Sequence, residues 1–164
     1  MQTRDPLALD DSPVLLGCFE VGGHTVAIDV AQLREVVRHR AATPLPGAPA
    51  SIEGVIDLRG TLVPVVDLAR ILGGVAMRGG PQARIAVAEV DGIAIGLAVD
   101  AAVQILSVQG GALGDPPALA VQSGCAATRA VLRRPDAAPI AVLSLEHVIE
   151  SLYREALAGG KGAR

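Results

Sequence analysis

The sequence predicts an all-β protein made of two small barrels that lie side by side. Short apolar runs rich in β-branched residues alternate with turn signals at Gly22-Gly23, Arg59-Gly60 and Asp91-Gly92, as expected for successive β-hairpins. The two halves of the 164-residue chain also resemble each other, with about five strands in each. Five short strands cannot bury one face as a flat sheet, whereas a small closed barrel buries that face and removes most exposed edges.

The internal duplication is visible in two pairs of segments. Residues 23–29 resemble residues 92–100, and residues 63–72 line up without a gap with residues 140–149. We expect antiparallel pairing, and an exchange of terminal strands between the barrels stays open. The expected strands are 14–21, 24–28, 35–40, 52–58 and 61–66 in the first half, and 83–90, 93–99, 103–108, 126–133 and 139–143 in the second.

The predicted elements divide the chain into consecutive segments. They are a flexible N-terminal tail (1–13), the first barrel (14–74), a connector (75–82), the second barrel (83–145), a C-terminal amphipathic helix (145–158) and a frayed tail (159–164). In the terminal helix, Leu145, Val148, Ile149 and Leu152 follow the i, i+3, i+4, i+7 spacing of one helix face. We therefore expect these four side chains to be largely buried against the barrels.

The stretch 52–72 is the most structured part of the sequence. Its two strands meet at Arg59-Gly60, where glycine adopts a positive φ without steric cost. Pro64 cannot donate a ladder hydrogen bond and therefore indicates an edge or a bulge. Asp67 is a suitable N-cap for a short helix that ends at Gly73. This hairpin–helix unit places one arginine in the turn between two strands.

Composition excludes several classes of function. The net charge is −3 and there is no basic run, which argues against nucleic acid as a partner because phosphate binding needs clustered Lys or Arg. Phe19 and Tyr153 are the only aromatic residues, so stacking platforms for single strands are also missing. No apolar run approaches the ~20 residues of a membrane span. Cys18 and Cys125 form no metal or disulfide pattern, and we expect a reduced, cytoplasmic protein.

Catalytic, cofactor and metal sites are not expected. The three histidines, His24, His39 and His147, are predicted on a turn, a strand and a helix, with no catalytic motif beside them. The glycine pairs lack a phosphate-loop pattern, and no ligand cluster suggests a metal. The alternative is a small-molecule-binding or catalytic protein with a site between the barrels. A deep polar pocket there would favour that alternative, and a shallow apolar groove would favour an adaptor.

The order of several short motifs resembles the CheW family. The residues that carry the resemblance are Ala27-Ile28-Asp29, Glu35-Val36, Pro49, Ile52, Gly54-Val55-Ile56, Leu58-Arg59-Gly60, Pro64-Val65-Val66-Asp67-Leu68, Gly96-Leu97-Ala98-Val99-Asp100, Leu106, Leu143 and Leu145-Glu146. They cover about residues 14–152 and match most specifically in 54–68. The resemblance implies two five-stranded SH3-like barrels and a scaffold. Such scaffolds couple the cytoplasmic tips of chemoreceptors to the regulatory domain of the histidine kinase CheA.

The resemblance also implies which residues contact the receptor. Arg59 matches the turn arginine of the family, and Glu35, Leu33 and Gly54 fall in the receptor-facing region. Asp57 stands where the family often has Asn, and a carboxylate there can pair with Arg59. The resemblance implies no cofactor, and a cytoplasmic location at receptor arrays on the inner face of the membrane without insertion into it.

The second barrel departs from the family pattern. Its departures are Gln104 in place of an acidic residue, Cys125 in place of an aromatic one, and Thr128 and Ala130 in place of glycines. Kinase-binding residues are therefore not assigned from the sequence.

Overall fold

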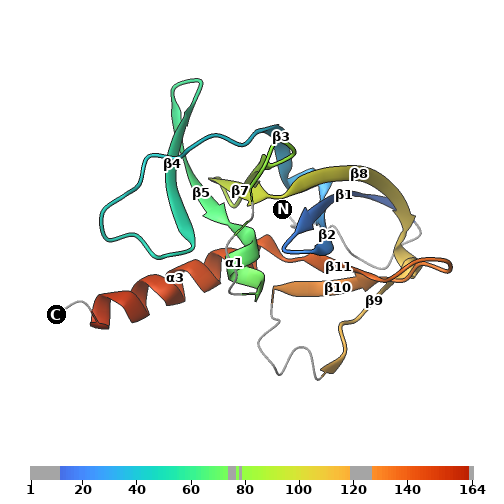
Figure 1. Cartoon of the computed structure of the whole chain (residues 1–164). Helices are drawn as coiled ribbons and strands as arrows, with labels where there is room; N and C mark the ends of the chain where they lie inside the picture. The colour runs from blue at the N-terminus through green and yellow to red at the C-terminus, as the bar shows by residue number, and fades with distance from the viewer. Residues whose placement is uncertain (1–11, 74–76, 78, 119–126, 163–164) are drawn as a thin grey trace.

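The computed structural model describes residues 12–73, 77, 79–118 and 127–162 (Figure 1). Most of the predicted N-terminal tail, part of the connector and Cys125 lie outside the described residues. The elements are β1 (Pro13–Val21), β2 (His24–Asp29), η1 (Val30–Gln32), β3 (Leu33–Arg38), β4 (Ile52–Leu58), β5 (Thr61–Asp67), α1 (Leu68–Gly73), β6 (Arg84–Val90), β7 (Ile93–Val99), β8 (Ala101–Gln109), η2 (Gly110–Ala112), β9 (Leu113–Gly114), β10 (Thr128–Leu132), β11 (Ile140–Leu143) and α3 (Leu145–Gly162).

The strands form two sheets, which confirms the predicted all-β class. One sheet has five strands in the order β3-β6-β7-β5-β4, and the other has six in the order β8-β1-β2-β11-β10-β9. The two orders are equivalent if β3, β6, β7, β5 and β4 are matched to β8, β1, β2, β11 and β10. The structure therefore repeats the internal duplication, and the short β9 is the additional strand, in a region predicted as loop.

The two halves of the sequence do not correspond to the two sheets. The hairpin β1–β2 belongs to the six-stranded sheet, and the hairpin β6–β7 belongs to the five-stranded one. Residues 14–74 give three strands to the five-stranded sheet, residues 83–145 give four to the six-stranded sheet, and each half gives one hairpin to the other. The exchange creates two parallel pairs, β5–β7 and β2–β11, where only antiparallel pairs were expected. Local hairpin signals predict neighbouring strands, and these pairs join strands that are distant in sequence.

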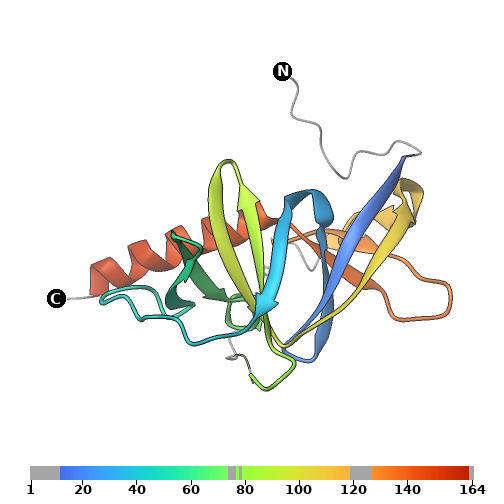
Figure 2. The same ribbon diagram turned by 90° about the horizontal axis from the view of Figure 1, so that it is seen from above.

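The exchanged hairpins are buried on both faces. In β6, Ile85 and Val87 belong to the core of the five-stranded sheet, while Ala86 and Ala88 face a central cluster. In β1, Leu16 packs into the core of the six-stranded sheet. The central cluster combines residues from both sheets, α1 and α3, so apolar side chains pack between the sheets. Figure 2 shows the two sheets from above.

The terminal helix α3 is longer than predicted, and its apolar packing lies in its first part. Leu145 and Val148 are buried, and Ile149 and Leu152 pack on the central cluster while remaining partly exposed. Further along, Leu157 is 70% exposed, and Glu155 Oε1 accepts a hydrogen bond from the backbone N–H of Ser51 at 3.2 Å. Gly159-Gly160 does not end the helix, which runs through residues 145–162 and extends beyond the sheets (Figure 1).

Candidate functional site

The β4–β5 hairpin carries the predicted partner-binding arginine in its turn. Leu58 pairs with Thr61, so Arg59 and Gly60 form a two-residue loop. Their φ angles are 52° and 86°, as a type I′ turn requires. Arginine is unfavourable at positive φ, because its Cβ comes close to the following carbonyl oxygen there. Gly, Asn and Asp are the residues usually found at that position. The residue choice at Arg59 is therefore not explained by the turn itself.

Arg59 forms an ion pair with Glu35, which lies on β3. Arg59 Nη1 donates to Glu35 Oε1 at 3.1 Å, and Arg59 Nη2 donates to Glu35 Oε2, so the contact is bidentate. The hydrogen bond from Arg59 lowers the pKa of the Glu35 carboxyl, and the same bond raises the pKa of Arg59. The structure thus brings together two of the four residues predicted to bind the receptor.

The side chains of this pair differ in exposure. Arg59 is 70% exposed and Glu35 is 30% exposed, so one edge of the guanidinium holds the carboxylate and the rest faces solvent. Asp57, the carboxylate suggested by the sequence as a partner of Arg59, instead accepts a hydrogen bond from the backbone N–H of Gly60 at 2.7 Å. Asp57 therefore stabilises the turn, and Glu35 orients the arginine.

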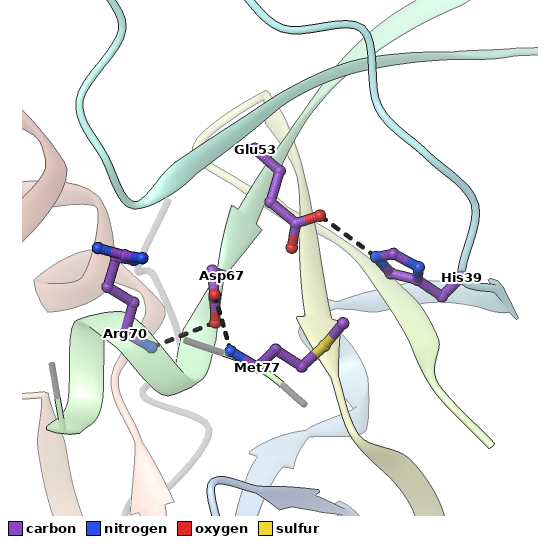
Figure 3. A network of polar contacts seen from close by, with 5 residues as sticks. All are labelled: His39, Glu53, Asp67, Arg70 and Met77. Carbon is purple, nitrogen blue, oxygen red and sulfur yellow. Dashed lines mark hydrogen bonds and ion pairs between the residues drawn. The ribbon is translucent and has the colours of Figure 1, made fainter. Parts of the chain in front are cut away.

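The ion pair lies at the gap between the two edge strands of the five-stranded sheet, β3 and β4. Two more side-chain contacts cross the same gap. Arg40 Nη2 donates to the carbonyl oxygen of Asp57 at 2.6 Å, and His39 Nε2 lies 3.2 Å from Glu53 Oε1 (Figure 3). Sequence reasoning missed the role of these residues, because the contacts join positions that are 14 and 17 residues apart.

Gly54 has a structural reason for being glycine. Its φ is 146°, and a Cβ there would lie 2.1 Å from the carbonyl oxygen of Thr43. That segment crosses β4 closely, since Thr43 and Val55 exchange two backbone hydrogen bonds of 2.8 and 2.9 Å. Gly54 therefore shapes the hairpin from within, and it has no side chain to offer a partner.

Leu33 is only partly available at the surface. It begins β3 and packs against the central cluster. Its Cδ1 lies so close to Gly17 that a Cβ added there would be 2.9 Å away. Val36 on β3 and Leu62 on β5 are the more exposed apolar side chains of these strands, at 43% and 67%. Arg59 therefore lies on a sheet that also exposes aliphatic side chains, and arginine is one of the residue types enriched in binding hot spots.

Two polar clusters outside this surface have structural roles. The buried Asp67 accepts hydrogen bonds from the backbone N–H groups of Arg70 and Met77, and so caps α1 and fixes the chain that follows it (Figure 3). The buried Ser144 lies 2.8 Å from His147 Nδ1 and donates to Glu146 Oε2. Ser144 also accepts from the backbone N–H of His147, as an N-cap does.

The described residues offer no group of three or more His, Cys, Asp or Glu side chains suited to a metal ion. Equally, none of the helices in the described parts of the chain has the length and apolar character that a membrane span needs.

Between the sheets, the described side chains of the central cluster are apolar. A groove of about 710 Å³ opens beside that cluster, between α1, the start of β2 and the β10–β11 hairpin. Most of the described residues that line it are apolar.

Comparison with known proteins agrees with the fold. Residues 16–152 match the model of the CheW-like domain. The chain is 35% identical over 138 residues to the chemotaxis protein CheW of Rhizobium meliloti (strain 1021), covering 84% of this chain and 88% of that protein. It is 25% identical over 139 residues to the chemotaxis protein CheW of Treponema pallidum (strain Nichols), covering 80% and 79%.

A solved structure shows the same fold. The crystal structure of the scaffolding protein TtCheW from Thermoanaerobacter tengcongensis superposes with a TM-score of 0.74 at 26% sequence identity, covering 88% of this chain and 91% of that chain. The family model spans most of the sequence, from within β1 to the first part of α3. The chain therefore belongs to the CheW-like domain family.

Proposed function

We propose that this chain is a chemotaxis scaffold that couples the cytoplasmic tip of a chemoreceptor to the regulatory domain of a CheA-type histidine kinase. Family membership and the names of the relatives support the scaffold role. The scaffold acts by holding two proteins in a fixed geometry and carries out no reaction. Signalling is then a change in the relative free energies of two bridge geometries.

The observation that carries this proposal is the Arg59–Glu35 pair at the turn of the β4–β5 hairpin. A turn that favours Asn or Gly carries an arginine, and a carboxylate from another strand orients its planar fork. An arginine held in this way can add hydrogen bonds to backbone carbonyls or carboxylates of a partner without losing much rotamer entropy. We assign the receptor to this surface and leave the kinase-binding residues open.

The proposed location is the cytoplasm, at receptor arrays on the inner face of the membrane. The protein reaches the membrane through its partner, and its own surface does not insert.

Binding titrations with a receptor cytoplasmic fragment and with the kinase regulatory domain test the proposal. The wild type is expected to bind each of them and to form a ternary complex with both. Arg59→Ala should weaken receptor binding by about tenfold, as truncation of an interface arginine does, and should affect kinase binding less. Arg59→Lys should not restore receptor binding fully, because lysine lacks the bidentate fork. Failure of the wild type to bind either partner would refute the function itself.

A further inference from the structure

The groove beside α1 has an apolar floor. Val26 of β2 and Ala141 of β11 are register partners in the parallel pair, and both line the groove. Ala69 and Leu72 of α1 form one wall. The volume of about 710 Å³ is within the range of sites that enclose a ligand or several side chains. In Figure 1 this region lies around α1 and β11, away from the tip of the β4–β5 hairpin.

Arg134 supplies a positive charge at the groove. Arg134 and His24 are the ionisable side chains among the described residues that line it. The nearest acidic group shown is Asp100, whose Oδ2 accepts a hydrogen bond from the backbone N–H of Gly22 at the rim. Arg134 Nε donates to the carbonyl oxygen of Ala138 at 2.9 Å, which orients the guanidinium across the β10–β11 turn. No described residue forms a hydrogen bond or ion pair with its two terminal nitrogens. An oriented guanidinium whose terminal nitrogens have no partner among the described residues, beside an apolar floor, is complementary to a carboxylate attached to aliphatic groups.

We propose that this groove binds a segment of a partner protein that carries aliphatic side chains and a carboxylate. The aliphatic side chains cover Val26, Ala141 and Leu72, and the carboxylate pairs with Arg134. The inference rests on the proposed scaffold function, because a bridge needs two surfaces that are occupied at once. The Arg59 surface and the groove use different elements, so one partner does not exclude the other.

A direct test uses the whole chain and two capped tripeptides, Leu-Glu-Leu and Leu-Gln-Leu, followed by amide chemical shifts in NMR titrations. The acidic peptide should shift the amides of Gly22, Gly23 and Ala141 and bind about tenfold more tightly than the neutral one, because only the former makes a charge-assisted hydrogen bond. Arg134→Gln should remove this difference. Arg133→Gln is the matched control, since Arg133 is exposed on the same turn and does not line the groove.

Three results would overturn the inference. The first is that the amide chemical-shift changes fall outside the groove, and the second is that the two peptides bind with equal affinity. The third is that free butyrate changes the amide chemical shifts as much as the acidic peptide does, which would indicate a small-anion site. The titration needs neither receptor nor kinase, so it is independent of the proposed function. In complexes with those two proteins, Arg134→Gln should weaken one of them about tenfold. Unchanged affinity for both, with Arg59→Ala still defective, would refute the groove as a docking site and leave the scaffold function standing.

Discussion

Replacement of Gly54 by alanine tests whether close backbone packing fixes the hairpin that carries Arg59. The added Cβ would lie 2.1 Å from the oxygen and 2.5 Å from the carbon of the Thr43 carbonyl. Both are backbone atoms, so no side chain can rotate to make room. The segment around Thr43 must move away from β4, and the two hydrogen bonds between Thr43 and Val55 must break.

The magnitude follows from two contributions. Alanine at a φ of 146° adds backbone strain of roughly 1–3 kcal/mol. Each lost backbone hydrogen bond costs about 0.5–1.5 kcal/mol. The expected loss is therefore about 4 kcal/mol, a large fraction of the 5–15 kcal/mol typical of a folded domain. For a chain of this size the melting temperature should fall by roughly 8–16 °C.

Urea and thermal unfolding of the wild type, Gly54→Ala and Gly60→Ala measure this effect. Gly60 is the matched control, because its φ is 86° and nothing lies within 4 Å of an added Cβ. Gly60→Ala should cost only the left-handed conformational penalty of about 1–2 kcal/mol. If the two variants lose equal stability, the contact with Thr43 does not fix the hairpin, and the structural reason given for Gly54 is wrong.

Three further outcomes are expected. Arg59→Asn should be no less stable than the wild type by thermal melting, because Asn suits a type I′ turn. Its affinity for the receptor fragment should fall. A receptor affinity equal to that of the wild type would place Arg59 outside the interface. The folded-state pKa of Glu35 is lowered, so its pairing with Arg59 stabilises the fold above the unfolded carboxyl value of 4.5, and this contribution is lost as pH falls through the folded-state value. The stability difference between wild type and Glu35→Gln in urea titrations should therefore shrink in acid, and a difference independent of pH would contradict the pairing. Leu145→Ala should cost about 2–5 kcal/mol and Leu157→Ala less than about 0.5 kcal/mol in the same assay; equal losses would show that α3 packs along its whole length.

The sequence predicts the local structure of this protein well, because its turns are specified by adjacent residues. Arg59-Gly60 and Asp91-Gly92 form the expected two-residue hairpin loops, with φ angles of 52°, 86°, 49° and 79°. Asp67 and Ser144, which the internal repeat aligns, both cap helices. Each of these features depends on a few consecutive side chains.

The sequence does not predict how distant segments pair. The exchange of hairpins between the sheets depends on which apolar face meets which, and β6 and β1 are apolar on both faces. The same limit applies to the site. Glu35 and Arg59 were each predicted as contact residues, yet nothing in the spacing of 24 positions indicates that they form one ion pair. The groove beside α1 was not predicted, because β2, α1 and β11 meet there only through the exchange.

The exchange of hairpins also explains how a small scaffold can transmit geometry between two partners. Each sheet contains strands from both halves of the chain, so neither sheet can complete its pairing without the other half. The central cluster then joins the two sheets through side chains of β1, β2, β6 and β7. Other side chains of the same four strands belong to the cores of the individual sheets. Close-packed interiors of this kind transmit displacement because they have little free volume. Under the proposed function, a partner held at Arg59 and another held at Arg134 are therefore connected through the packed clusters of the described residues.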